Sequence, residues 1–198
     1  MKRRRITANL VPVSILAIAI AAPSFASVIP AGQTTQRFPW APEFACNLNP
    51  ARPQGLHPGA LQAVQMIGVA HRITQAMNNT SARRNVHQTD GTLNGRTYAG
   101  AVDISVRCLT AAQIKMLLSR LADVGFAAWY RKDGQDDWSG PPHIHAVWAG
   151  CNLKPVLQRQ VESWIDGRNG LGGDHPYQFW HATTTMKDKV RTLYRMFN

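Results

Sequence analysis

Apolar residues recur at helical spacing in several parts of the chain, which predicts amphipathic helices. In the first such part, Leu61, Val64 and Ile67 begin an apolar stripe that continues to Met77. In the second, Thr110 is a suitable N-cap and Gly125 follows the last apolar position, so both helix ends are marked. The predicted helices span residues 60–77, 110–124, 153–165 and 183–197.

Shorter apolar runs lie between these helices and predict strands. Residues 98–106 are apolar except for Asp103 and Ser105, and residues 125–130 form a second run. A polar loop over residues 132–140 leads into a third extended segment. The middle of the chain is therefore predicted to run strand, helix, strand, loop, strand.

The amino terminus has the pattern of a secretory signal peptide over residues 1–26. Lys2 to Arg5 form a positive segment, residues 10–22 are apolar, and Ser24-Phe25-Ala26 is a small-x-small cleavage pattern. A transmembrane anchor is the alternative, but the apolar run falls short of the ~20 residues that a spanning helix needs. The pattern predicts a secreted or periplasmic protein with no membrane span after cleavage.

The mature chain is predicted to hold one domain. Residues 27–58 are rich in Pro, Gln and Thr and predict an extended arm, while residues 59–198 suffice for a single domain with its own core. Removing Lys2 to Arg5 leaves 22 − 4 = 18 basic against 11 acidic residues, a balance of +7. This excess suits anionic cell-wall polymers or lipid head groups, with plain solubility as the alternative. No nucleic-acid-binding motif occurs, so no nucleic-acid partner is expected.

The cysteines Cys46, Cys108 and Cys151 are expected to form one disulfide and leave one thiol free in an oxidising compartment. Cys108 and Cys151 follow Asp103 and His145 by five and six residues, so they would align if the two strands ran parallel. In antiparallel strands that pairing fails, and Cys46 must bond to one of them. The absence of a C-x-x-C pair argues against a cysteine zinc site.

His143 and His145 are the strongest chemical signal in the sequence. Side chains at i and i+2 of a strand point the same way, so both rings can address one metal ion or one substrate. Neutral imidazole is the commonest protein metal ligand and also titrates near neutral pH. The alternative is two histidines on the solvated face of a strand.

A second cluster, upstream, contains His87 and Asp103. Asp103 lies in an apolar strand, where a carboxylate is costly to bury unless it is paired or coordinates a metal ion. His87 and the H-x-H strand are the available partners. Two histidines, one carboxylate and a water molecule form a catalytic zinc arrangement, whereas a structural site has four protein ligands.

These residues resemble a known group of zinc proteins. A histidine, a Gly/Ala-rich stretch running into Ala101-Val-Asp-Ile104, and a later Pro142-His-Ile-His145 are similar to the group of D-alanyl-D-alanine peptidases, lysostaphin-type endopeptidases and the hedgehog domain. The resemblance covers about residues 85–150. It implies an α+β fold with a small antiparallel sheet and flanking helices, with zinc ligands His87, Asp103 and His145 and with His143 as the catalytic residue.

The sequence departs from the group at two positions. The histidine that its closest members carry seven residues before the Asp is replaced by Arg96, and His87 lies sixteen residues before Asp103. We therefore expect a hairpin between the two ligands, with turns at Asp90-Gly91 and Asn94-Gly95. The alternative is that Asp90 replaces Asp103 as the ligand, although a residue before Gly is more simply a turn former. Pro142 occupies the place of the acidic base, which leaves His143 in that role, with Asp136 or Asp137 as weaker candidates.

The function expected from these residues is a secreted zinc peptidase that hydrolyses peptidoglycan peptides. Arg84, close before the first ligand, is a candidate for binding a substrate carboxylate, with a solvated charge as the alternative. The rival function is a non-catalytic binding protein of the same fold that keeps the metal, which the missing acidic base favours. A secreted nuclease lacks the additional acidic ligands and basic clusters expected for it.

Overall fold

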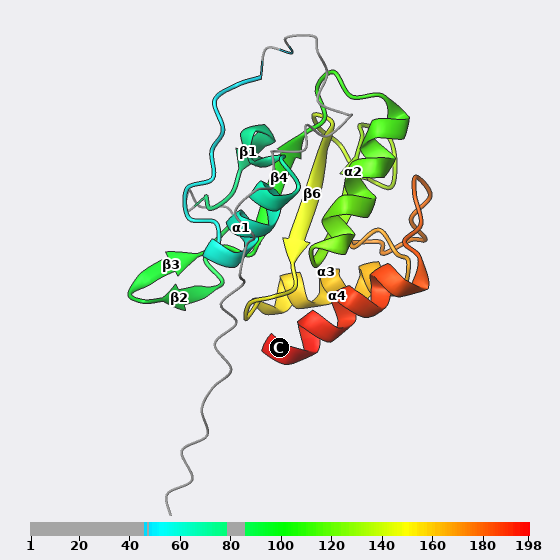
Figure 1. Cartoon of the computed structure of the whole chain (residues 1–198). Coiled ribbons are helices and arrows are strands. Elements are labelled where there is room, and N and C mark those ends of the chain that lie inside the picture. The colour runs from blue at the N-terminus through cyan, green and yellow to red at the C-terminus, as the bar shows by residue number, and fades with distance from the viewer. Residues whose placement is uncertain (1–45, 47, 79–85) are drawn as a thin grey trace, which may run out of the picture. The chain divides into compact units, whose positions relative to one another are not determined.

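The computed structural model describes residues 46, 48–78 and 86–198 (Figure 1). The predicted signal peptide at residues 1–26, most of the arm at residues 27–58, and Arg84 lie outside the described residues. The helices are α1 (Pro58–Met66), a 3₁₀ turn (Ala70–Arg72), α2 (Ala111–Asp123), α3 (Pro155–Ile165) and α4 (Thr184–Phe197). The strands are β1 (Ile73–Gln75), β2 (Gly91–Leu93), β3 (Arg96–Tyr98), β4 (Ala101–Ser105), β5 (Phe126–Arg131) and β6 (His143–Trp148).

Four of the strands form an antiparallel sheet in the order β1-β4-β6-β5. Its central pair, β4 and β6, sets Asp103 opposite His145 and Ser105 opposite His143. On the other side of β6, Trp129 lies opposite His145 and Arg131 opposite His143. The predicted α+β architecture with a small antiparallel sheet is confirmed, as is the order strand, helix, strand, loop, strand.

Each face of this sheet has its own core, because alternate residues of a strand point to opposite faces. Val102, Ile104 and Ile144 pack in one core with residues of α1 and α2. Ala101, Val147 and Trp129 pack in the other core with Leu157, Val161 and Trp164 of α3. Asp103 and His145 continue the second face along β4 and β6, so both polar side chains belong to the face that α3 covers.

The helix predicted over residues 60–77 is correct only in its first half. Helix α1 ends at Met66, Gly68 has φ +73°, and its amide donates to Gln65 O while that of Val69 donates to Val64 O. These two bonds form a Schellman motif, which turns the chain out of the helix. The later apolar positions of the stripe therefore serve a strand, in which Ile73 is buried.

Helix α2 begins and ends as predicted. The Thr110 hydroxyl accepts from the Gln113 amide and the Gln113 side chain accepts from the Thr110 amide, which is a complete capping box. Helices α3 and α4 also match their predicted ranges to within two residues at each end. Among the described residues, no helix combines the length and the apolar character needed to cross a bilayer.

The hairpin expected between His87 and Asp103 is present as β2 and β3 (Figure 1). Asn94 and Gly95 connect the two strands with φ of +50° and +75°, the left-handed pair that a tight two-residue turn requires. Gly91 pairs with Tyr98, which closes the hairpin. The excursion therefore returns the chain to the sheet just before Asp103.

The expected disulfide between Cys108 and Cys151 is wrong. Cys108 is bonded to Cys46, and Cys151 is a buried free thiol. The reason is the strand direction: β4 and β6 run antiparallel, so the residues that follow them leave from opposite ends of the sheet. Cys46 is then the partner, which was the alternative that antiparallel strands required.

Candidate metal centre

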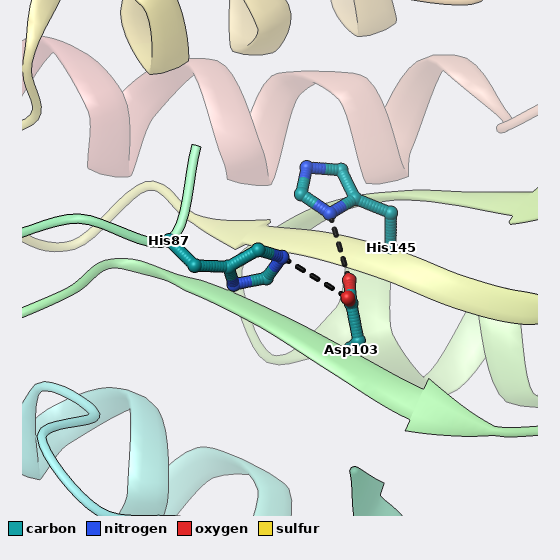
Figure 2. Close-up of side chains that lie close together, drawn as sticks. All are labelled: His87, Asp103 and His145. Carbon is teal, nitrogen blue, oxygen red and sulfur yellow. Dashed lines mark hydrogen bonds and ion pairs between the residues drawn. The ribbon is translucent and has the colours of Figure 1, made fainter. Parts of the chain in front are cut away.

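Three side chains from separate segments meet on the α3 face of the sheet. His87 Nε2 lies 3.0 Å from Asp103 Oδ2, and His145 Nδ1 lies 3.0 Å from Asp103 Oδ1. Figure 2 shows both rings directed at the carboxylate. One ligand atom from each residue can be chosen so that all three lie within 4.8 Å of one another, a group that could hold a metal ion.

Each ring is held by a hydrogen bond from its other nitrogen. His87 Nδ1 donates to the carbonyl oxygen of Ala76 at 2.9 Å, and Ala76 directly follows β1 in the chain. His145 Nε2 lies 3.1 Å from Gln160 Oε1, and Gln160 Nε2 donates to Gly170 O at 3.3 Å. With the amide oriented in this way, the ring donates to Oε1. Such outer hydrogen bonds orient metal-binding histidines and select the nitrogen that binds.

The three residues form an arrangement of acceptors that face one another. A neutral ring that donates from Nδ1 carries a lone pair on Nε2, and the converse holds for His145. Both lone pairs then point at Asp103, whose carboxylate also only accepts. Only a cation placed between them, a metal ion or added protons, makes this arrangement favourable.

The pKa values of Asp103 and His145 are shifted in directions that favour an ionised carboxylate and a neutral His145 ring. Burial lowers the pKa of His145, so this ring resists protonation. Burial also acts to raise the pKa of Asp103, but contacts with His145 and His87 outweigh it and hold that pKa well below its usual range. An ionised carboxylate beside a neutral imidazole is the charge state that a divalent ion binds.

His143 lies beside the three candidate ligands rather than among them. Its Nε2 is 3.7 Å from Asp103 Oδ1, and its Nδ1 donates to Pro141 O at 2.8 Å. Trp138 packs edge-on against the ring at a centroid distance of 5.0 Å. The ring is therefore fixed from behind, with a proton-accepting nitrogen directed toward the candidate metal centre.

A cavity of about 530 Å³ opens over these residues. His87, Asp103, His143 and His145 line it, together with Arg131 and Trp138. Its volume falls within the roughly 300–1,000 Å³ of small-molecule and cofactor sites. A molecule from solvent can therefore reach the residues that are candidates to bind the metal ion.

The rival ligand Asp90 has a different role. Its side chain is fully buried, where it accepts from the amides of Gly100 at 2.6 Å and Lys154 at 3.0 Å. Its carboxylate also lies 3.6 Å from Lys154 Nζ. Both oxygens are therefore engaged in joining the hairpin to the start of α3, away from the candidate ligands.

The weaker base candidates lie outside the cavity. Asp137 Oδ2 is 3.2 Å from His175 Nε2 in an exposed pair, and Asp136 has φ +53° in the same loop. Neither of them lines the cavity that contains His143. Of the proton-transfer candidates named from the sequence, His143 is the one that the fold brings to the centre.

Two site residues were not foreseen from the sequence. Arg131 ends β5 and lines the cavity, and strand alternation with Trp129 was a signal for its orientation. Gln160 is a polar position on the α3 face that carries Leu157, Val161 and Trp164. A buried amide on an apolar stripe needs a partner, and His145 is that partner.

Comparison with protein-family models, with curated proteins and with solved structures found no match to this chain.

Proposed function

We propose that this protein is a secreted zinc metallopeptidase that hydrolyses peptidoglycan peptides. One observation carries the proposal: two ring nitrogens and one carboxylate, all acceptors, converge at 3.0 Å in a cavity that reaches solvent. A two-histidine, one-carboxylate set is a common catalytic zinc site, with the fourth position left to water. The ligand pattern and the H-x-H strand also support a hedgehog and D-alanyl-D-alanine peptidase type of fold.

His87 Nε2, His145 Nδ1 and an oxygen of Asp103 would hold the ion, and Gln160 and Ala76 O would orient the rings. The chemistry that zinc would supply there is polarisation of the scissile carbonyl and a lower pKa for bound water. His143 Nε2 accepts the proton of the attacking water, and its Nδ1 bond to Pro141 O keeps the ring in the required tautomer. The same ring then protonates the leaving amine.

The cell-wall location rests on three further features. A signal-like amino terminus and the Cys46–Cys108 disulfide suit an exported protein. The calculated mature balance of +7, 18 basic minus 11 acidic residues, suits a negatively charged wall polymer.

Zinc content and peptide release from purified peptidoglycan test the proposal together. The exported protein should hold about one zinc ion per chain, and His145→Ala should lose both zinc and activity because a ligand is removed. His143→Ala should keep zinc and lose about 10²-fold or more in hydrolysis, as the loss of a general base does. Exposed His181→Ala is the matched control and should change neither property.

The alternative function is a non-catalytic, metal-containing binding protein at the cell envelope. Pro142 favours it, because this position is acidic in the carboxypeptidases that the sequence resembles. Zinc-loaded protein that binds peptidoglycan peptides and hydrolyses none of them would establish this alternative and overturn the peptidase proposal. Protein that is isolated from zinc-containing medium without metal would overturn both.

A further inference from the structure

Arg131 brings a buried positive charge to the wall of the cavity. The residue is only 1% exposed, and it lines the cavity with the candidate metal ligands. Among the described residues, neither Nη1 nor Nη2 of its guanidinium has a hydrogen-bond partner. Buried charges are normally paired, because removing an unpaired ion from water is strongly unfavourable.

Arg72, another buried arginine, shows how this chain pairs a terminal nitrogen of such a group in a structural role, while its Nε has no partner among the described residues. It is 2% exposed, and its Nη1 donates to the carbonyls of Ser105 and Arg107 at 3.3 and 3.1 Å. Arg131 has no equivalent carbonyls at its terminal nitrogens within the described part of the chain. Its terminal donors are therefore available to a group that the described residues do not supply.

The carboxylates near Arg131 do not fill this role. Asp136 and Asp103 act on Arg131 only through space, and the oxygens of Asp103 face His87 and His145 at 3.0 Å. No ion pair within 4.0 Å joins Arg131 to an acidic residue in the described ranges. Burial lowers the pKa of Arg131 to about 10, which still leaves it charged at neutral pH.

The guanidinium is oriented by an aromatic contact that suits the binding of a planar anion. Its Cζ lies 5.1 Å from the centre of the Trp129 ring, and that ring in turn stacks on His145. Packing against an aromatic ring leaves the N–H edge of a guanidinium free to donate. That edge can donate two parallel hydrogen bonds to the two oxygens of one carboxylate.

The sheet register sets how far this anion would lie from the reacting bond. Arg131 pairs with His143, and paired residues of antiparallel strands have Cα atoms about 4.5–5.5 Å apart. An extended peptide advances about 3.3–3.6 Å per residue. A carboxylate on Arg131 would therefore lie within about one or two residues of a carbonyl presented beside His143.

We propose that Arg131 binds a carboxylate of the peptide ligand next to the metal centre, so that the site selects anionic peptides. The assignment deepens the proposed function and rests on it for the position of the scissile bond. The carboxylate has two sources, the free carboxyl terminus of the peptide or an acidic side chain near the bond.

Calorimetric binding of three small probes to the zinc-loaded exported protein tests the assignment. The probes are acetyl-D-alanine, its carboxamide, and acetyl-D-glutamic acid with its α-carboxyl amidated. At least one carboxylate probe should bind about 10- to 100-fold more tightly than the carboxamide, the range expected for a charged hydrogen bond. The carboxylate probe that binds more tightly identifies the source.

Arg131→Met should remove this preference, and Arg131→Lys should keep part of it, because an ammonium keeps the charge without the fork. Exposed Lys132→Met is the matched control for the loss of one nearby charge and should keep the full preference. Equal binding of all three probes to the unaltered protein would overturn the inference, as would an unchanged preference in folded Arg131→Met.

If Arg131→Met does not fold, Arg131→Lys and the unaltered protein still decide the question. Binding is measured without turnover, so a carboxylate preference in protein that hydrolyses nothing would overturn the peptidase proposal and leave Arg131 as the anion site. Hydrolysis of peptides by a protein that shows no carboxylate preference would overturn the assignment of Arg131 and keep the peptidase proposal.

Discussion

At the scale of single residues, the centre is built from the hydrogen bonds behind its rings. Gln160 illustrates this, because its Oε1 accepts from His145 Nε2 while its own amide is anchored on Gly170 O. That bond fixes Nδ1 as the nitrogen that faces Asp103. The identity of the binding atom is thus set by a residue on α3, fifteen positions away from the histidine.

Gln160→Leu should weaken zinc binding about 10- to 100-fold, the usual effect of losing an outer hydrogen bond to a metal ligand. Competition with a chelator of known affinity measures this change. Gln158→Leu is the matched control on the same helix and should leave zinc affinity unchanged, since Gln158 donates to Asn198 outside the centre. Equal zinc affinity in Gln160→Leu and in the unaltered protein would show that the ring is oriented by other contacts.

At the scale of elements, the β2–β3 hairpin is tied to α3 through Asp90. Its carboxylate joins the amide of Gly100, just before β4, to the backbone and side chain of Lys154, the N-cap residue of α3. The attachment fixes the base of the hairpin against the start of α3, while the pairing of β4 with β6 sets Asp103 on the α3 face. Asp90 therefore has a structural role at the hairpin base.

Asp90→Ala should lower the free energy of unfolding by about 3 kcal/mol, because it leaves Lys154 and two amides without their buried partner. Denaturant unfolding measures the loss, and zinc analysis of the folded variant should still show the ion. Folded Asp90→Ala without zinc would instead support Asp90 as a ligand. Asp133→Ala, at an exposed turn carboxylate, is the control for removing an acidic side chain.

At the scale of the whole molecule, one covalent link joins the amino-terminal part of the domain to the end of the β4 segment. Cys46 and Cys108 are 62 positions apart, and Cys46 precedes all of the helices and strands of the described residues. The bond closes a loop that contains α1, β1, the hairpin and β4. Two of the candidate ligands, His87 and Asp103, lie within that loop.

Replacing Cys46 and Cys108 with serine should cost about 4 kcal/mol of stability, the chain-entropy expectation for a loop of this length. Thermal and denaturant unfolding under oxidising conditions measure this loss. Cys151→Ala is the control, because that thiol is free and its removal breaks no covalent link. Equal stability of the double serine variant and the unaltered protein would contradict a stabilising disulfide.

The sequence alone was sufficient for the ends of α2 and for the hairpin turn, where the signal is local. Thr110 and Gly125 mark the ends of α2 through hydrogen bonds within a few residues, and Asn94-Gly95 specifies its turn through backbone sterics. The segment 60–77 was less accurately predicted, because its apolar spacing is compatible with a helix and the Schellman turn at Gly68 redirects it. The H-x-H pair was readable because strand alternation alone sets both rings on one face.

What the tertiary structure decided involves residues that are distant in the sequence. The antiparallel register of β4 and β6 determined both that Asp103 lies opposite His145 and that Cys108 bonds to Cys46 rather than Cys151. The same register, continued into β5, placed Arg131 in the cavity with its terminal nitrogens unpaired among the described residues. Residue types and spacing identify the groups that are able to do chemistry. Strand direction and burial decide which of these groups meet, because both depend on contacts between distant segments that the local sequence pattern does not encode.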